Sequence, residues 1–458
     1  DESSYNPGRG DFEVPELFRQ LWTVPCFGFQ PETTPTCFGG FSGDLSAPSE
    51  STSHVARYNP LYYAIVGLPS LLPLSPSTVI YMRLVGAALN ALLIAYGIKT
   101  LVEISRPTWP ILGFAAALTP MVIYHASSLT PQGVELTGAA STWVILLALS
   151  RSDDAGLRRS WLWRLALVSS FFVLSRGVSP LYLAIVVGVV IFAAPRIRQV
   201  IEIVRDRKSW PQLIVCVGVG VIALAYTLIS GSLALGVVYP DPTLTPSGLV
   251  RVMVGNTGAY LEQLIGVFGW GETHLPLWVL LLSGGVVIVV SIVGWSLATV
   301  RQKIAIFSLV AIAGALPILM QLQSLEESGL VWQGKYVLPL AMGLPIVAGF
   351  LASQAPMTEE VGSRVAPQGV ILIALVQVVA FATNLKRYVS GAHGEWFNLT
   401  EVSWQPVLNP YLFVVLYVLL WGALVVAAHR VLSTPRDADS AESMAIREPK
   451  MTRESATP

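Results

Sequence analysis

Two adjacent carboxylates, Asp1 and Glu2, open the chain and are candidates for general-base chemistry. A positioned carboxylate can take the proton of a sugar hydroxyl, while its neighbour orients the acceptor or binds a divalent metal such as Mg²⁺ or Mn²⁺. The same pair is equally typical of solvated loop acids, and Asp11 and Glu13 compete for the role. These carboxylates predict a catalytic base only if the surrounding elements form a site.

Basic residues recur where apolar segments reach the side of the membrane that carries the long loops. Ionisable groups at that depth are costly, so they usually form ion pairs or face a cavity. Arginine binds two phosphate oxygens at once, so a lipid-linked phosphate would account for them. The alternatives are side chains that extend toward water or ion pairs with nearby acids. The set consists of Arg83, Arg176, Lys335 and Arg251, for which we expect phosphate binding, with Lys386 and Arg387.

Glu135 is a lone carboxylate one turn into an apolar segment. A carboxylate at that position is expected either to pair with Arg176 or Arg83 or to act in the site by orienting an arginine or the acceptor.

Two short segments combine aromatic and polar residues, 269–274 and 332–336. Tryptophan and tyrosine at a membrane interface are most often anchors in the headgroup region, although tryptophan can also stack on a sugar. We retain Trp270, Glu272 and Tyr336 as candidates for binding or orienting an acceptor.

The three cysteines divide between two environments. Cys26 and Cys37 lie in the polar N-terminal segment, where they form a disulfide or remain two free thiols. Cys216 lies in an apolar run and is expected to be a small core residue.

Several function classes are disfavoured by what the sequence lacks. It contains no nucleotide-binding glycine loop, no HExxH motif and no cluster of Cys and His with metal-ligand spacing, and its five histidines are scattered. ATP-driven transport is therefore not expected. The net charge is zero, so the composition gives no reason to expect a nucleic-acid partner.

The candidate residues must be positioned by helices inside a lipid bilayer. The chain of 458 residues is 53% hydrophobic and 12% charged, about half the charge of a soluble protein. Apolar runs of about 20 residues have the length of a membrane-spanning helix. The sequence therefore predicts an all-α integral membrane protein with about eleven spans. We place them at 79–102, 109–126, 131–150, 161–178, 180–195, 213–235, 275–299, 304–322, 336–353, 368–385 and 409–432.

Lysine and arginine indicate the orientation of these spans. If the first span runs inward, the inner side carries 19 basic residues and the outer side nine. This predicts a cytoplasmic C-terminus and a first loop outside the cytoplasm. An exported loop needs a preceding signal, which is either a cleaved signal peptide or one more helix before Asp1. We expect the helix, which gives about twelve spans.

The expected organisation has five parts. Residues 1–78 form an outer loop that ends in a proline-rich re-entrant or interfacial segment, and residues 236–274 form an outer loop with an interfacial helix. Residues 79–235 and 275–432 form bundles of six and five helices. Residues 433–458 are polar and predicted to be disordered.

Several short strings follow one another along most of the chain: Asp1-Glu2, the stretch 58–63, Arg83, the stretch 127–135, Arg176 with Ser179-Pro180, 268–270, 333–339 and 403–406. In their order and spacing they resemble a family of bacterial polytopic membrane proteins known as domain of unknown function 2142, which is similar to the GT-C class of glycosyltransferases. Lys335 stands where the family pattern suggests arginine, and Thr130 and Gln132 also depart from it, which affects the expected contacts to a lipid headgroup and not the fold.

The resemblance implies an enzyme of the bacterial plasma membrane that transfers a sugar from a polyprenyl-phosphate donor to an envelope glycan or glycolipid acceptor. Asp1 or Glu2 would be the base, outside the cytoplasm, and Arg83, Arg176, Lys335 and Arg251 would hold the phosphate. The rival hypotheses are a polysaccharide polymerase or ligase, a flippase or transporter of lipid-linked sugars, and a non-catalytic scaffold for envelope assembly.

Overall fold

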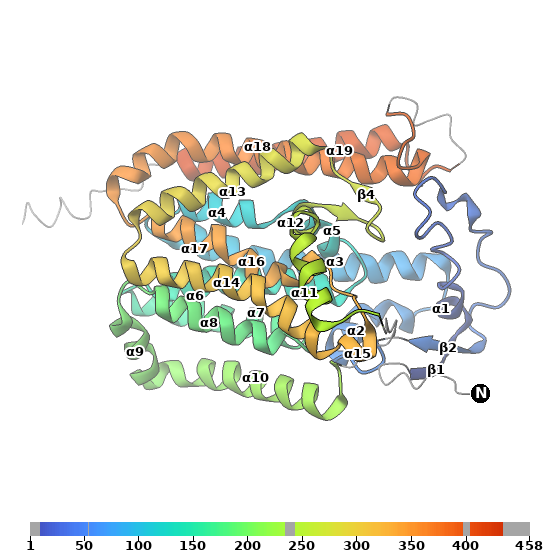
Figure 1. The fold of residues 1–458 in the computed structure, drawn as a ribbon, viewed down its shortest axis with the longest axis horizontal. Coiled ribbons are helices and arrows are strands. Elements are labelled where there is room, and N and C mark those ends of the chain that lie inside the picture. Colours follow the sequence, from blue (N-terminus) through green and yellow to red (C-terminus); the bar gives the residue numbers. More distant parts are fainter. Residues whose placement is uncertain (1–9, 54, 234–242, 397–403, 434–458) are drawn as a thin grey trace, which may run out of the picture.

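The computed structural model describes residues 10–53, 55–233, 243–396 and 404–433. Long helices run side by side, and most of the loops gather at one end of the bundle (Figure 1). We call the end that carries residues 10–75 the loop end, and the end that carries helix α9 the opposite end. Asp1 and Glu2 lie outside the described residues, as does the tail 434–458.

The first half of the chain contributes a small loop-end region and the first helices of the bundle. The region before the bundle contains β1 (Gly10–Pro15), α1 (Glu16–Gln20), η1 (Pro35–Cys37), β2 (Pro48–Ser53), α2 (Pro60–Val66) and η2 (Leu68–Leu71). The helices are α3 (Pro76–Glu103), α4 (Thr108–Ala117), α5 (Pro120–Ala126), α6 (Pro131–Leu149), α7 (Ala155–Val173), α8 (Ser179–Ala193), α9 (Ile197–Arg205), η3 (Arg207–Ser209) and α10 (Trp210–Ser230).

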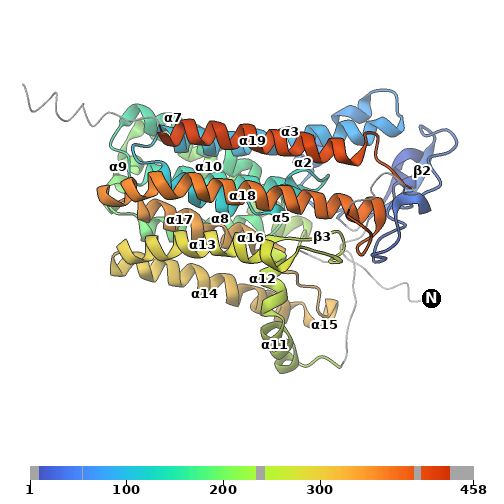
Figure 2. The same cartoon turned by 90° about the horizontal axis from the view of Figure 1, so that it is seen from above.

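The second half returns to the loop end before completing the bundle, as the view from above shows (Figure 2). Its loop-end elements are α11 (Pro246–Gly255), α12 (Thr257–Ile265), β3 (Val267–Phe268), β4 (Thr273–His274), α15 (Leu325–Ser328) and η4 (Gly334–Val337). Its other helices are α13 (Leu277–Leu297), α14 (Val300–Gln323), α16 (Leu338–Ala341), α17 (Gly343–Ala352), α18 (Pro356–Ser390) and α19 (Pro410–Ser433).

The prediction of an all-α membrane protein is confirmed, and each predicted span coincides with helix. Within the described ranges, eight helices are long and apolar enough to cross a bilayer, or nine if α4 and α5 are one bent span. The remaining two predicted spans, α7 and α8, do not meet this criterion. Helix α8 has only 15 residues, and α7 includes Arg158, Arg159 and Arg164. Arg164 is buried in an ion pair with Glu103, at 2.7 Å.

Helix α6 lies at the centre of the bundle. It packs between α3 and α7, and 94% of its most apolar stretch is buried. Small residues permit this close packing, since a Cβ at Gly138 would lie 3.0 Å from the Cβ of Phe172. A polar residue near the start of α6 is therefore held in the protein interior and not in lipid.

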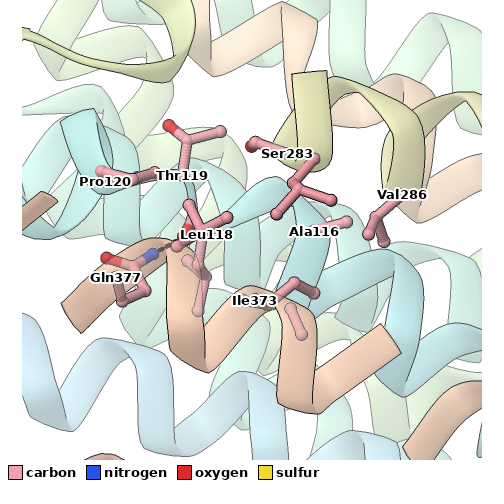
Figure 3. Close-up of a pocket in the computed structure, with 11 residues that line it drawn as sticks. Ala116, Leu118, Thr119, Pro120, Ser283, Val286, Ile373 and Gln377 are labelled. Carbon is pink, nitrogen blue, oxygen red and sulfur yellow. Dashed lines mark hydrogen bonds between the residues drawn. The ribbon is translucent and has the colours of Figure 1, made fainter. Parts of the chain in front are cut away.

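The predicted span 109–126 is broken, because Pro120 cannot continue the hydrogen-bonding pattern of a helix. Helices α4 and α5 meet at 68°. The carbonyl of Leu118 at the break accepts a hydrogen bond from Gln377 Nε2 at 2.7 Å, and the Thr119 hydroxyl donates to the Leu264 carbonyl at 2.8 Å. Figure 3 shows Leu118, Thr119, Pro120 and Gln377 around a cavity of about 10 Å³. The break is thus bonded to distant parts of the chain, once through the Gln377 side chain and once through the Leu264 carbonyl.

Two loop-end regions differ in detail from the prediction. The interfacial helix expected within 236–274 is two short helices, α11 and α12, separated at Asn256. The N-terminal loop contains an antiparallel pair, β1 and β2, in which Gly10 lies opposite Ser53 and Pro15 opposite Pro48. Its proline-rich end forms α2, whose first turn is capped by the Asn59 side chain.

Candidate functional site

Glu135 lies in the second turn of α6, where the Thr130 side chain caps the helix and Pro131 occupies its first position. Its side chain is completely buried. A buried carboxylate must be paired and hydrogen-bonded to be tolerated. Both oxygens have a partner: Ser179 Oγ donates to Oε1 at 2.7 Å and Arg176 Nη1 donates to Oε2 at 3.2 Å.

Arg176 comes from the turn between α7 and α8, at the loop end. Its guanidinium lies over the ring of Tyr336, 5.3 Å from the ring centre, and its side chain also interacts with the hydroxyl of Tyr58. The side chain is 18% exposed. Of the two alternative partners predicted for Glu135, the structure thus selects Arg176.

Lys335 brings a second cation to this position. It is half-buried and near enough to Arg176 for the two charges to repel one another. Within the described part of the chain, the Lys335 ammonium has no anionic partner at ion-pair distance, and Glu135 compensates only one of the two cations. We call Glu135, Arg176, Ser179 and Lys335 the cationic cluster, because its net charge is positive.

The backbone that carries Lys335 is held firmly on three sides. Gln132 Nε2 donates to the Lys335 carbonyl at 3.3 Å and the Tyr182 hydroxyl donates to the Tyr336 carbonyl at 2.8 Å. A Cβ at Gly334 would lie 2.3 Å from the Tyr260 carbonyl oxygen, so only glycine permits this approach to α12. The backbone at Lys335 is therefore fixed, whereas the Lys335 ammonium has no ion-pair partner among the described residues.

Tyrosines of α2 line the same region. Tyr62 is buried and Tyr63 is partly exposed, and Tyr63 lies near Tyr58 and Arg176. Burial raises the pKa of Tyr62 to about 12 and raises the pKa of Tyr63 as well. Both side chains are therefore neutral phenols at physiological pH, able to donate hydrogen bonds to an anion.

His125, which the sequence did not distinguish from the other histidines, is also here. It is 6% exposed, and neither ring nitrogen has a hydrogen-bond partner. Lys335 and Arg176 are near enough to act on it electrostatically. A buried imidazole has one donor and one acceptor to satisfy, so His125 is a further polar group available to a ligand. No local sequence pattern marks His125, because its position near Lys335 and Arg176 depends on tertiary contacts.

The other two predicted phosphate ligands lie apart from the cluster. Arg83 is exposed on α3, and its Nε donates to the Ser127 carbonyl at 2.7 Å. Arg251 is exposed on α11, and no hydrogen bond or ion pair among the described residues joins it to Arg176 or Lys335. The structure therefore brings together Arg176 and Lys335, with Glu135 and Tyr336 beside them.

Trp270 and Glu272 hold the first loop against the bundle. Glu272 Oε1 accepts from Arg387 Nη2 at 2.6 Å, in an ion pair whose arginine is 1% exposed. Arg387 also donates to three carbonyls of the first loop, those of Phe27, Gln30 and Thr33. The Trp270 ring packs edge-on against Phe27, with 5.7 Å between ring centres. We call this assembly the Arg387 staple.

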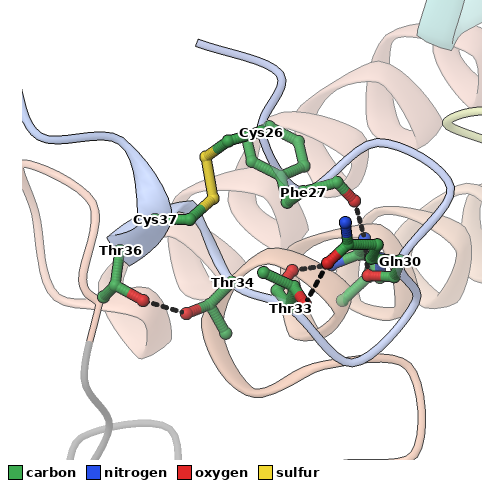
Figure 4. The surroundings of a disulfide bond; sticks show 8 residues. Cys26, Phe27, Gln30, Thr33, Thr34, Thr36 and Cys37 are labelled. Atoms are coloured by element: carbon green, nitrogen blue, oxygen red, sulfur yellow. Dashed lines mark hydrogen bonds between the residues drawn. A yellow bond between two sulfur atoms is a disulfide. The ribbon is translucent and has the colours of Figure 1, made fainter. Parts of the chain in front are cut away.

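The disulfide allowed by the sequence is formed. Cys26 and Cys37 are joined with a Cα–Cα distance of 6.0 Å, and Figure 4 shows the loop that the bond closes. Glu32 in the same loop contacts His393 beyond the end of α18, and this hydrogen bond holds the pKa of the Glu32 carboxyl below its ordinary value. The loop is thus fixed both internally and to the bundle.

Of the candidate bases, Asp11 and Glu13 can be placed, both in β1, where Glu13 lies opposite Glu50. Asp11 has a hydrogen-bond partner in the neighbouring strand, since its Oδ1 accepts a hydrogen bond from Thr52 Oγ1 at 2.6 Å. Asp1 and Glu2 fall outside the described residues, so their role remains a prediction. Among the residues that the structure describes, no group of three or more His, Cys, Asp or Glu side chains could hold a metal ion.

The sequence model of a family described as "predicted membrane protein (DUF2142)" matches residues 31–344. The chain belongs to this family. The match covers more than half of the chain and includes the cationic cluster, whereas α18 and α19 lie beyond it. No curated protein and no solved structure matches the chain.

The match confirms the resemblance to the DUF2142 family and the multi-pass membrane character of the protein, whereas the similarity to GT-C glycosyltransferases stays a prediction. The family description names no reaction. Any activity has to be argued from the cationic cluster and the helices that surround it.

Proposed function

We propose that this DUF2142 protein is a membrane glycosyltransferase of the bacterial plasma membrane. It would transfer a sugar from a polyprenyl-phosphate donor to an envelope glycan or glycolipid, on the side of the membrane outside the cytoplasm.

The observation that carries the proposal is the uncompensated positive charge of the cationic cluster. A cation without a partner at membrane depth is costly, and a phosphate group would remove that cost by binding Lys335 and Arg176 together. Arg176 and Lys335 come from separate segments of the backbone. Together with the adjacent phenols, they can bind several oxygens of one tetrahedral anion. A protein that used these residues only for structure would have no need of the second cation.

The reaction needs one base and one stabilised leaving group. Asp1 or Glu2 would take the proton of an acceptor hydroxyl, whose oxygen then forms a bond to the anomeric carbon. The bond from that carbon to the phosphate oxygen breaks, and polyprenyl phosphate leaves with an additional negative charge. Arg176 and Lys335 would stabilise that charge as it develops. Direct attack would invert the configuration of the anomeric carbon.

Two features support an outward-facing loop end. The Cys26–Cys37 disulfide belongs to this end, and disulfides persist in oxidising compartments such as the periplasm. The excess of lysine and arginine in the loops of the opposite end is typical of the cytoplasmic side. The C-terminus would then be cytoplasmic.

The test is sugar transfer by the purified full-length protein in liposomes, using a panel of polyprenyl-phosphate sugars. We expect transfer from one donor, its loss in Asp1→Asn or in the double variant with Glu2→Gln, and a strong reduction in Lys335→Met. Lys208→Met is the matched control, because Lys208 is exposed near the opposite end.

Full activity in Asp1→Asn, Glu2→Gln and the double variant would refute these bases and favour a polymerase or ligase. Donor-independent movement of the lipid across the bilayer would favour a flippase. A folded protein that does neither with any donor would favour an assembly scaffold.

A further inference from the structure

A groove of about 440 Å³ opens on the surface of the bundle, between α5 and α19. Its volume lies in the range of small-molecule sites. All of its lining side chains are apolar or aromatic, so the groove suits a hydrocarbon chain and gives no hydrogen bonds to a polar ligand along most of its length. The residues that line it are Ile123, Tyr417, Leu420, Trp421, Ala423 and Leu424.

The α19 wall is fixed by aromatic contacts. The Tyr417 ring stacks on Phe381 of α18, with 4.2 Å between ring centres, and Trp421 meets Tyr417 edge-on at 6.4 Å. These contacts hold two large rings of the groove wall, so its shape does not depend on free rotamers.

An exposed cation lies at the loop-end side of this groove. The Ser127 amide donates to the Ile123 carbonyl at 3.0 Å, which places Ser127 one helical turn beyond Ile123. Arg83 Nε donates to the carbonyl of the same Ser127 at 2.7 Å. The two Nη atoms of Arg83 have no acceptor at hydrogen-bond distance among the described residues, and they can bind a phosphate.

We propose that this groove holds the prenyl chain of a polyprenyl phosphate, with Arg83 bound to its phosphate. An apolar channel that ends one turn from an arginine complements a lipid with one hydrocarbon chain and an anionic head. The choice of lipid rests on the proposed function, because it makes the occupant the carrier lipid of that reaction.

The position of the groove explains how such a lipid would reach the cationic cluster. Ile123 is followed directly by Tyr124 and His125, and His125 lies near Lys335 and Arg176. A lipid entering sideways from the bilayer would meet Arg83 first and the cluster next. The head would then move along the end of α5 while the chain stays in apolar surroundings.

The experiment is photo-crosslinking in nanodiscs of phosphatidylcholine, with a polyprenyl phosphate that carries a diazirine near its phosphate end. We expect crosslinks on α5 and α19, competed by unlabelled polyprenyl phosphate and not by phosphatidylglycerol. Ala423→Trp would fill the groove, and Arg83→Gln would weaken phosphate binding. Each should lower the yield about tenfold, equivalent to about 1.4 kcal/mol.

Val415→Trp is the matched control, since Val415 is exposed on a different face of α19. Equal competition by phosphatidylglycerol would make the groove a site for bulk lipid and overturn the proposal, as would unchanged crosslinking in Ala423→Trp. Sugar transfer that is unaffected by Ala423→Trp would refute the groove but not the enzyme. Specific crosslinking without any transfer would refute the enzyme but not the groove.

Discussion

Two arginines at the loop end, Arg387 and the partly exposed Arg176, pair with glutamates, yet their surroundings differ. Arg387 of the staple gives its hydrogen bonds to Glu272 and to three carbonyls of the first loop. Arg176 shares its glutamate with a serine hydroxyl and lies near Lys335, whose ammonium has no counter-ion in the described ranges. A saturated arginine connects parts of the fold, whereas an incompletely compensated one is prepared to receive an anion.

Removing the saturated arginine should have the largest effect on stability. Arg387→Ala would leave Glu272 buried without its partner and free three loop carbonyls, at a cost of about 5 kcal/mol in the free energy of unfolding. Unfolding by SDS titration would measure it. Arg364→Ala, which breaks an exposed pair on the same helix, should cost less than about 1 kcal/mol. Equal costs for the two variants would remove the distinction between staple and surface pair.

Breaking the cluster pair should have a smaller effect that a second substitution reverses. Arg176→Gln would leave Glu135 buried and uncompensated, at about 3 kcal/mol. Adding Glu135→Gln should recover most of this loss, because the neutral amide no longer needs a cation. The double variant should still fail to transfer sugar. Recovery of transfer together with stability would show that the pair is purely structural.

Lys335→Met should change stability in the opposite direction. It removes a half-buried charge that repels Arg176. The free energy of unfolding should therefore stay equal or rise, by about 1 kcal/mol at most, and the variant should unfold at an equal or higher SDS fraction. Added polyprenyl phosphate should stabilise the wild-type protein against unfolding through its phosphate group, and this stabilisation should be smaller in the variant. A marked loss of stability would mean that Lys335 has a structural partner.

The smallest effect concerns the hydrogen bond that links the first loop to the end of α18. The pKa of Glu32 is lowered chiefly by His393, so this contact stabilises the folded state above the ordinary carboxyl pKa and is lost as pH falls through the lowered value. Hydrogen exchange of residues 23–37 should therefore accelerate, relative to the intrinsic rate, from about pH 6 to about pH 3. The acceleration should be weaker in His393→Ala, and an unchanged profile would contradict this assignment.

The sequence predicted the helices well and the site only in part. Apolar runs locate spans because each must cross the bilayer core, so all eleven fell on helices. The break at Pro120 was not predicted, because a proline alone does not decide whether a span breaks: Pro317 and Pro367 lie inside the continuous helices α14 and α18. Because a buried charge needs a partner, membrane depth predicted that Glu135 pairs with Arg176 or Arg83, and only the structure selects Arg176.

Other parts of the site depend on tertiary contacts that no local pattern encodes. His125 lies near the cationic cluster because the fold brings the end of α5 close to Lys335 and Arg176. Arg387 was grouped with the phosphate ligands because its depth resembles that of Arg176, whereas its contacts are with carbonyls of a loop more than 350 residues away in the sequence. Trp270 packs against Phe27 of the first loop and Glu272 pairs with Arg387, contacts that the sequence did not indicate, and their role at an acceptor stays a prediction.

The break between α4 and α5 has a consequence for how the protein is made. Neither helix alone, with ten and seven residues, reaches the length of about 20 residues that crosses a bilayer. The Leu118 carbonyl at the break is satisfied by Gln377, which follows it by 259 residues. At about 5–20 residues per second, that partner is synthesised on the order of tens of seconds later. Until then the Leu118 carbonyl lacks the hydrogen bond from Gln377, so the membrane-insertion machinery must accommodate an unpaired polar group at the break.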